Sequence, residues 1–532
     1  MIQATKRLVS SLGASPRIPK VSQSARRFHR MRTNAAIAFQ LTLLSAGMAT
    51  AQEPIRVTTR LIEVNVIARN HLGPVGDLKQ GEFKLFDDGK EQPIAIFRVS
   101  RTTPPGAGQT PLPPGVFSNR YGPNANRSGA ATVLLIDTLN TDTADQVYAQ
   151  QQIIKLLDAF DVQAPIALYV LTEKIVVLRD FTMDLESLRE AITAWRPAQS
   201  RVLFASQTPT PPMAGDPNTA TAVSRSFQEM RAFYDLQRAN RTVDAFALLA
   251  QSLARVPGRK NVVWVSGSFP AVFLNRNQER IRLLNQADIG VYPVDARGLV
   301  AMNVNPRAPL QARSGPPPGL DTMSEIAEMT GGRAFYNNND LRGAVGKAIA
   351  DTLIVYTLGF YSRHQKSDGL YHELNVRIAG RSGIKLRHRN GYYDDMSASE
   401  EPSSPKILRR VAQAPLDATG IGLTATIDQN RDLLRVHVHI DFQDLLSNKD
   451  SHWKGAAEVA LVSQGVDGRT LNLVSKAISF DMTDGAYAAR QRDGFAIEQN
   501  IPSSRDVSRI RVVILDLSTG VTGSVAINLQ KQ

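Results

Sequence analysis

The sequence predicts an α/β fold with a mostly parallel central sheet and one antiparallel hairpin at its edge, flanked by β-sandwich modules. Between residues 131 and 352, short continuous apolar runs alternate with segments of helical period, which is typical of strands covered on both faces. Before and after this region, apolar and polar residues alternate and turn residues separate the runs. The chain has 532 residues, enough for several folded units.

The spacing of the central runs predicts how their strands pair. Only Thr172, Glu173 and Lys174 separate the second run from the third. They are too few for a crossover helix, so this pair is expected to be the antiparallel hairpin. The expected strands are Val133–Ile136, Ile166–Leu171, Ile175–Leu178, Val262–Val265, Ile289–Val294 and Arg333–Tyr336. The expected helices are Ala144–Phe160, Leu185–Trp195, Thr242–Leu253 and Leu341–Leu353.

The N-terminus reads as an export signal. Arg32 precedes an apolar stretch from Ala35 to Met48, which ends in a small-residue cleavage site at Ala51. The stretch is shorter than the ~20 apolar residues of a membrane anchor. Either the charged region is unusually long or translation begins at Met31. We expect cleavage after Ala51, and an exported product, periplasmic or secreted, with no stable membrane span.

Composition excludes several classes of protein. The formal net charge is +13, but residues 1–51 hold eight Lys or Arg and no acidic residue. The rest carries 54 basic and 49 acidic residues, too small a surplus for a nucleic-acid groove, so no nucleic-acid partner is expected. The absence of cysteine excludes disulfides, thiolate nucleophiles and cysteine-bound zinc.

The chain divides into segments at changes of pattern. The expected segments are a signal peptide at 1–51, an N-terminal β segment at 52–103, a Pro/Gly-rich linker at 104–130, the α/β domain at 131–352, further strands at 353–396, a second linker at 397–418 and a C-terminal β-sandwich at 419–532. A lone hairpin is marginal in water, so strands 353–396 are expected to complete a sandwich with 52–103. The α/β domain would then be an insertion.

Residues 131–352, with their order of strands and helices and the opening Leu134-Leu135-Ile136-Asp137, resemble the Rossmann-like von Willebrand factor A fold. The whole layout resembles the bacterial VWFA-related proteins described from acidobacteria. The stretches that carry this likeness are GEFKLFDDGKEQPIAIF, LLIDTLNTD, LARVPGRKNVVWVSG, IGVYPVDARGL and YTLGFYS with GYYD.

The resemblance implies a metal-ion-dependent adhesion site on the rim where the strands of the sheet end. The family motif is Asp-x-Ser-x-Ser, and here Asp137 and Thr141 match it in chemistry, whereas Leu139 removes one hydroxyl. Thr242 matches a threonine that opens a helix. Ser266 stands where a carboxylate is expected.

Asp295 follows the next strand and is our own addition to this degenerate set, as a second carboxylate on the same rim. Magnesium requires near-octahedral oxygen ligation, so a divalent cation (Mg²⁺, Mn²⁺ or Ca²⁺) would bind weakly, and no other cofactor is expected. The alternative is a metal-free, hydrogen-bonding rim in which Asp137 only caps a helix.

Two irregular insertions, residues 197–239 and 301–320, are expected at the same rim, either as partner-binding surface or as spacer. The catalytic motifs that a sequence readily reveals are absent. We therefore expect a non-enzymatic binding or adhesion protein for a protein or cell-envelope ligand. The alternatives are an exported hydrolase with an unrecognised Asp/His site and a structural envelope protein with a vestigial site.

Overall fold

The structure is a computed structural model that describes residues 61–102, 113, 115–119, 130–159, 164–208, 216–254, 256, 258–267, 278–297, 320–336, 340–362, 369–393, 404–429, 433–445, 448–449 and 452–529. The expected signal peptide, most of the 104–130 linker and most of the 301–320 insertion lie outside these residues. Within the described part of the chain, no helix is long and apolar enough to cross a membrane.

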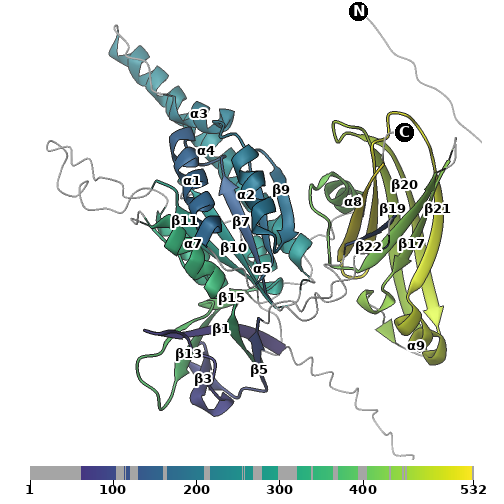
Figure 1. Cartoon of the computed structure of the whole chain (residues 1–532), viewed down its shortest axis with the longest axis horizontal. Helices are drawn as coiled ribbons and strands as arrows, with labels where there is room; N and C mark the ends of the chain where they lie inside the picture. The colour runs from purple at the N-terminus through teal and green to yellow at the C-terminus, as the bar shows by residue number, and fades with distance from the viewer. Residues whose placement is uncertain are drawn as a thin grey trace, which may run out of the picture. The chain divides into compact units, whose positions relative to one another are not determined.

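The middle part of the sequence forms a five-stranded mixed sheet (Figure 1). Its strands are β7 (Ala130–Asp137), β8 (Ile166–Leu171), β9 (Ile175–Thr182), β10 (Arg259–Ser266) and β11 (Ile289–Asp295), in the order β11-β10-β7-β8-β9. Strands β11, β10, β7 and β8 pair in parallel, whereas β9 is antiparallel to β8. All residues of β8, β10 and β11 are buried.

Helices cover both faces of this sheet, which explains why β8, β10 and β11 are buried along their whole length. One face packs against α1 (Thr143–Ala159), α2 (Leu185–Ala194) and α7 (Leu341–Ala350). The other packs against α4 (Pro217–Leu253), α5 (Gln278–Gln286) and α6 (Leu320–Thr330). The short helix α3 (Arg201–Gln207) packs on α4.

The predicted fold class of the chain, α/β on a mostly parallel Rossmann-like central sheet, is wrong, whereas the antiparallel hairpin predicted at the edge of that sheet is confirmed by the pairing of β8 with β9. The described residues form five sheets; four are antiparallel throughout and the fifth is the mixed one. The prediction gave too much weight to the continuous apolar runs. Strands outside the mixed sheet such as β3, β13 and β17 alternate between buried and exposed residues, which is typical of antiparallel sheets with one solvated face.

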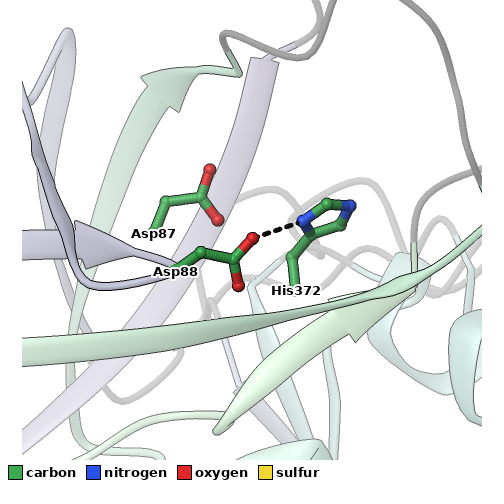
Figure 2. A group of neighbouring side chains, drawn as sticks. All are labelled: Asp87, Asp88 and His372. Atoms are coloured by element: carbon green, nitrogen blue, oxygen red, sulfur yellow. Dashed lines mark hydrogen bonds and ion pairs between the residues drawn. The ribbon is translucent and has the colours of Figure 1, made fainter.

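Two antiparallel sheets combine strands from both sides of the mixed sheet in the sequence. The first contains β14 (Lys385–Arg387), β1 (Leu61–Asn70), β12 (Ile354–Tyr361) and β5 (Ile96–Arg101), with β2 (Gly73–Pro74) paired to β1. The second contains β15 (Gly391–Tyr393), β13 (Tyr371–Ile378), β3 (Phe83–Asp87) and β4 (Lys90–Gln92). They share one core of buried apolar side chains. At the end of β3, the side chains of Asp87, Asp88 and His372 lie together (Figure 2).

The last part of the chain forms two more antiparallel sheets around a common apolar core. One contains β21 (Phe495–Pro502), β17 (Leu433–Ile440), β16 (Leu423–Gln429) and β6 (Val116–Ser118). The other contains β18 (Asn448–Lys449), β19 (Trp453–Gln464), β22 (Arg509–Asp516) and β23 (Thr522–Asn528), with β20 (Thr470–Met482) paired to β19. Helix α9 (Asp484–Asp493) connects β20 to β21.

Strand β6 comes from within the stretch predicted as a linker and pairs with β16. The neighbouring Asn119 is buried and fixes this pairing, because its Nδ2 donates to the carbonyls of Ala418 and Ile421, at 2.7 and 2.8 Å. Three residues are too short for a strand pattern in a sequence, so this pairing was not predicted.

Three helices lie in segments that were predicted to be irregular or linker. The stretch 197–239, expected to be irregular, contains α3 and α4 as far as residue 239. Helix α4 begins at Pro217 because the Asp216 side chain caps Thr219, and no proline or glycine interrupts it before Leu253. Helix α8 (Ser404–Gln413) lies in the second predicted linker and buries one apolar face against β19 and β22.

Candidate functional site

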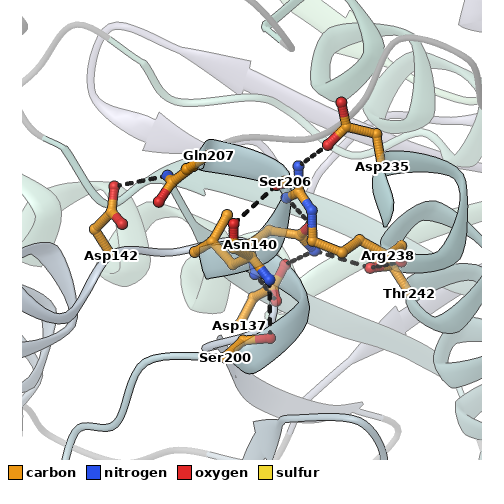
Figure 3. Close-up of polar contacts among 10 residues, drawn as sticks. Asp137, Asn140, Asp142, Ser200, Ser206, Gln207, Asp235, Arg238 and Thr242 are labelled. Atoms are coloured by element: carbon orange, nitrogen blue, oxygen red, sulfur yellow. Dashed lines mark hydrogen bonds and ion pairs between the residues drawn. The ribbon is translucent and has the colours of Figure 1, made fainter. Parts of the chain in front are cut away.

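The candidate site lies where β7 and β10 end beside helix α4 (Figure 3). We call the five residues Asp137, Asn140, Arg238, Thr242 and Ser266 the rim network, because hydrogen bonds connect them. Asp137 is the last residue of β7 and Ser266 the last of β10. These strands are parallel neighbours, so their final side chains meet at one edge of the sheet.

Asp137 is fully buried at the centre of the network. Its Oδ2 accepts hydrogen bonds from Asn140 Nδ2 (2.8 Å), Trp264 Nε1 (2.9 Å) and Ser266 Oγ (2.9 Å), and its Oδ1 accepts one from the Asn140 backbone N–H (3.0 Å). Burial raises the pKa of Asp137 above its usual value, while these donors act in the opposite direction. The carboxylate therefore depends on protein donors in place of water.

Asn140 connects Asp137 to helix α4. Its Nδ2 also donates to Thr242 Oγ1 at 2.9 Å, and its Oδ1 accepts from Arg238 Nη1 at 2.7 Å. The carboxylate needs a donor and the guanidinium needs an acceptor, so the orientation of this amide is fixed by its neighbours. Arg238 is 6% exposed and its Nη2 pairs with Asp235. No described residue accepts a hydrogen bond from its Nε.

The five residues expected at the site are only partly brought together. Asp137 and Ser266 are bonded directly, and Thr242 joins them through Asn140. Thr242 lies within α4 and does not open a helix, since α4 begins 25 residues earlier, at Pro217.

The remaining two residues have other partners. Thr141 Oγ1 accepts from the Gly267 backbone N–H at 2.8 Å. Asp295 is neutralised by Arg297, whose Nε and Nη2 each donate to it at 2.9 Å. Asp295 therefore does not add a free carboxylate to the rim.

These residues do not fit a magnesium ion. The ion would have to lie among Asp137, Thr242 and Ser266, where the Asn140 amide N–H₂ donates to both Asp137 and Thr242. The adjacent charge is the Arg238 guanidinium. Mg²⁺ requires an octahedron of oxygen ligands, and an N–H donor cannot contribute to it.

Sequence reasoning missed Asn140, Trp264 and Arg238. A signal existed for two of them, since Asn140 lies inside the motif stretch 137–141 and Arg238 precedes Thr242 by four residues, one helical turn. Because the helix was predicted to begin at Thr242, Arg238 fell in an expected loop. Its position beside Thr242 could not be inferred.

Exposed apolar side chains lie on α4, which bears Arg238 and Thr242 of the rim network, and on the neighbouring helix α3. Phe204 on α3 is 62% exposed, and Phe233 and Leu236 on α4 are 60% and 40% exposed. The helices are held together by a hydrogen bond from Arg231 Nε to the Thr208 carbonyl at 3.0 Å. We call Phe204, Phe233 and Leu236 the aromatic patch.

A cavity of about 430 Å³ lies elsewhere, lined by ten residues that include Glu63, Arg282, Asp288, Arg389 and Tyr393. It contains none of the rim network. The side chains of the rim network are buried and hydrogen-bonded to one another.

No protein-family model and no curated protein matches the chain. Solved structures that are similar include an aerotolerance-related membrane protein from Bacteroides fragilis, with 13% identity and a TM-score of 0.26 over 42% of this chain and 98% of that one. The PilB minor pilin from Streptococcus sanguinis has 8% identity and a TM-score of 0.23, over 42% and 62%. A von Willebrand factor type A protein from Catenulispora acidiphila has 8% identity and a TM-score of 0.25, over 76% and 78%.

Proposed function

We propose that this chain is an exported, non-enzymatic binding protein of the VWFA-related kind, which recognises a protein or cell-envelope ligand at the rim of the mixed sheet. The N-terminal pattern of residues 31–51 supports export. Contact with the ligand is made by the aromatic patch, and the buried Arg238 supplies the positive charge of the rim without a metal ion.

The aromatic patch is the observation that carries this proposal. A large aromatic side chain that is more than half exposed gains little by remaining in water, and exposed apolar clusters are typical of interaction surfaces. Phe204 and Phe233 come from two helices that pack on each other beside the buried rim. Aromatic side chains are enriched in the centres of protein interfaces, and a polar rim surrounds them there.

Arg238 supports the metal-free form of the proposal. Its guanidinium supplies from the chain itself the positive charge that a cation would bring to the rim. Asn140 and Asp235 hold the guanidinium in place. Its Nε is enclosed by the chain, so Arg238 would act on the ligand through its charge and not through a hydrogen bond.

Replacing both aromatic residues, Phe204→Ser with Phe233→Ser, is expected to reduce ligand capture at least ~10-fold, because central aromatic contacts contribute about 2 kcal/mol or more each. The immobilised full chain is incubated with envelope extract, and the protein enriched by the wild type is identified and quantified by mass spectrometry. Leu72→Ser is the matched control, since Leu72 is 84% exposed and lies between β1 and β2. Equal capture by the double variant and the wild type would support a structural envelope role instead.

Millimolar Mg²⁺ and a chelator are both expected to leave capture and the melting temperature unchanged. The physical reason is that Asn140 and Arg238 occupy the place of the cation. Isothermal titration calorimetry of the full chain with MgCl₂ measures this directly. A Mg²⁺-dependent heat that disappears in Asp137→Asn would contradict the metal-free form and favour a weak cation site.

A further inference from the structure

We propose that Asp87, Asp88 and His372 form a binding site for one divalent transition-metal ion of the zinc class. This site is separate from the rim network and does not depend on the function proposed for it. The three residues come from strands β3 and β13 and the turn that follows β3, so they are 285 positions apart in sequence but adjacent in the fold (Figure 2).

The backbone fixes the positions of all three residues. Asp87 ends β3 opposite Leu374, and His372 lies two residues earlier on β13. Asp88 and Gly89 form the two-residue turn between β3 and β4, and both have positive φ, 47° and 77°. The Asp88 backbone N–H donates to the Glu373 carbonyl, and the Glu373 N–H donates to Asp88 Oδ1 at 2.8 Å. The turn is therefore fastened to the start of β13.

The distances suit a single ion. The potential ligand atoms of the three residues lie within 4.8 Å of one another, and His372 Nδ1 is 2.8 Å from Asp88 Oδ2. Zinc bonds of about 2.0–2.2 Å place two ligand atoms of a tetrahedral ion about 3.4 Å apart. Small side-chain rotations convert one arrangement into the other, with water completing the coordination.

Charge and ligand type select the ion. Two carboxylates balance a charge of 2+, and an imidazole nitrogen favours Zn²⁺ over the harder Mg²⁺ and Ca²⁺. The contact between His372 Nδ1 and Asp88 Oδ2 needs a proton between the two atoms. Metal binding at Nδ1 replaces that proton: a neutral ring then carries its proton on Nε2, and a protonated ring releases one proton to solvent.

The surroundings hold the ligands in place. Asp87 and His372 are almost completely buried, whereas the Asp88 side chain is 43% exposed and gives an ion access. The His372 ring stacks on Tyr392, with ring centroids 5.2 Å apart. The Tyr392 hydroxyl lies 3.4 and 3.5 Å from the two oxygens of Asp87. A stacked, buried imidazole has little room for a substrate, so this grouping favours a metal site over the active site of a hydrolase.

The test measures zinc bound to the full chain after equilibrium dialysis, together with the melting temperature. The wild type is expected to bind one Zn²⁺ at this site and to melt at a higher temperature with it. Asp88→Asn and His372→Asn are expected to weaken this binding at least ~10-fold, as loss of a metal-site residue usually does. Asparagine tolerates the positive φ of position 88 and can still accept the Glu373 N–H, so Asp88→Asn should fold.

The matched control is His452→Asn, which removes a second histidine in contact with an aspartate. His452 Nδ1 lies 2.7 Å from Asp481, but there Lys454 supplies the neighbouring charge in place of a second carboxylate. Zinc binding should be unchanged in this variant. No zinc bound by the wild type, or the same binding in Asp88→Asn and His372→Asn, would show that Asp88 and His372 form only a structural ion pair.

Discussion

Replacing Asp137 by alanine is expected to lower the free energy of unfolding by about 3–5 kcal/mol, the largest loss predicted for this chain. The change removes the hydrogen-bond acceptor of four buried donors. These are Trp264 Nε1, Ser266 Oγ, and the backbone N–H and side-chain Nδ2 of Asn140. Each buried donor left without a partner costs about 1–3 kcal/mol, and part of this cost is recovered when water enters the space.

Asp137→Asn should cost less than Asp137→Ala. The asparagine amide can turn its oxygen toward the three donors on the Oδ2 side, so that only the Asn140 backbone N–H faces an N–H₂ group. The order of stability is therefore wild type, then Asp137→Asn, then Asp137→Ala. Urea denaturation followed by tryptophan fluorescence measures it, because Trp264 loses its hydrogen bond at the same time.

Asp142→Ala is the control, since Asp142 lies in the same loop but is exposed and accepts only a 3.3 Å hydrogen bond from Gln207. Its effect should stay within about 0.5 kcal/mol. If Asp137→Ala were as mild as this control, the rim network would not hold β7, β10 and α4 together. The metal-free rim proposed above would then lose its physical basis.

Lys260→Met is expected to stabilise the chain by about 2 kcal/mol at pH 7. Lys260 lies in β10 and is 2% exposed, and burial lowers its pKa from 10.5 to about 8, against the opposing charge of Asp288. That shift corresponds to about 3 kcal/mol of destabilisation when the side chain is protonated. Methionine has a similar shape but loses the 2.8 Å hydrogen bond from Nζ to the Val256 carbonyl, which offsets part of the gain.

The advantage of Lys260→Met should depend on pH in one direction. The folded pKa of Lys260 is below the unfolded value, so the buried lysine is least unfavourable above pH 10.5, where it is neutral in both states. Wild-type stability relative to the variant is lost as the pH falls from 10.5 through about 8. The gain from methionine is therefore full below pH 8 and disappears toward pH 10.5.

Urea midpoints of both proteins at several pH values give this difference, in which the contributions of other titrating groups cancel. Lys454→Met, at an exposed strand position, is the control and should show no such slope. A stability difference that does not change with pH would mean that Lys260 is not buried as a charged group.

Position along the chain allowed part of the site to be predicted. Asp137 and Ser266 end apolar runs, and the ends of neighbouring parallel strands meet at one edge, so their proximity follows from strand pairing. The role of Asn140 was not predictable in this way. An asparagine in a loop has many possible partners. Its actual partner Arg238 lies 98 positions further along the chain, and only the folded structure brings the two side chains together.

The pairings between distant parts of the chain were harder to predict than the elements themselves. Alternating residues indicate strands, but they do not reveal which strand lies beside which. Strand β6 pairs with β16 across 300 residues, and His372 meets Asp88 across 284.

The pairing of β5 with β12 has a consequence for engineering. Arg101 and Ile354 are direct partners in the register, so the backbone leaves and re-enters this sheet at adjacent points. A short designed turn could bridge them and excise everything between, leaving the paired strands continuous. The excision would also remove β6 and uncover an edge of the final sandwich at β16. A replacement for the excised part must therefore include a strand that pairs with β16 in place of β6. Excision without such a strand would leave the edge of β16 exposed and prone to pair with another chain.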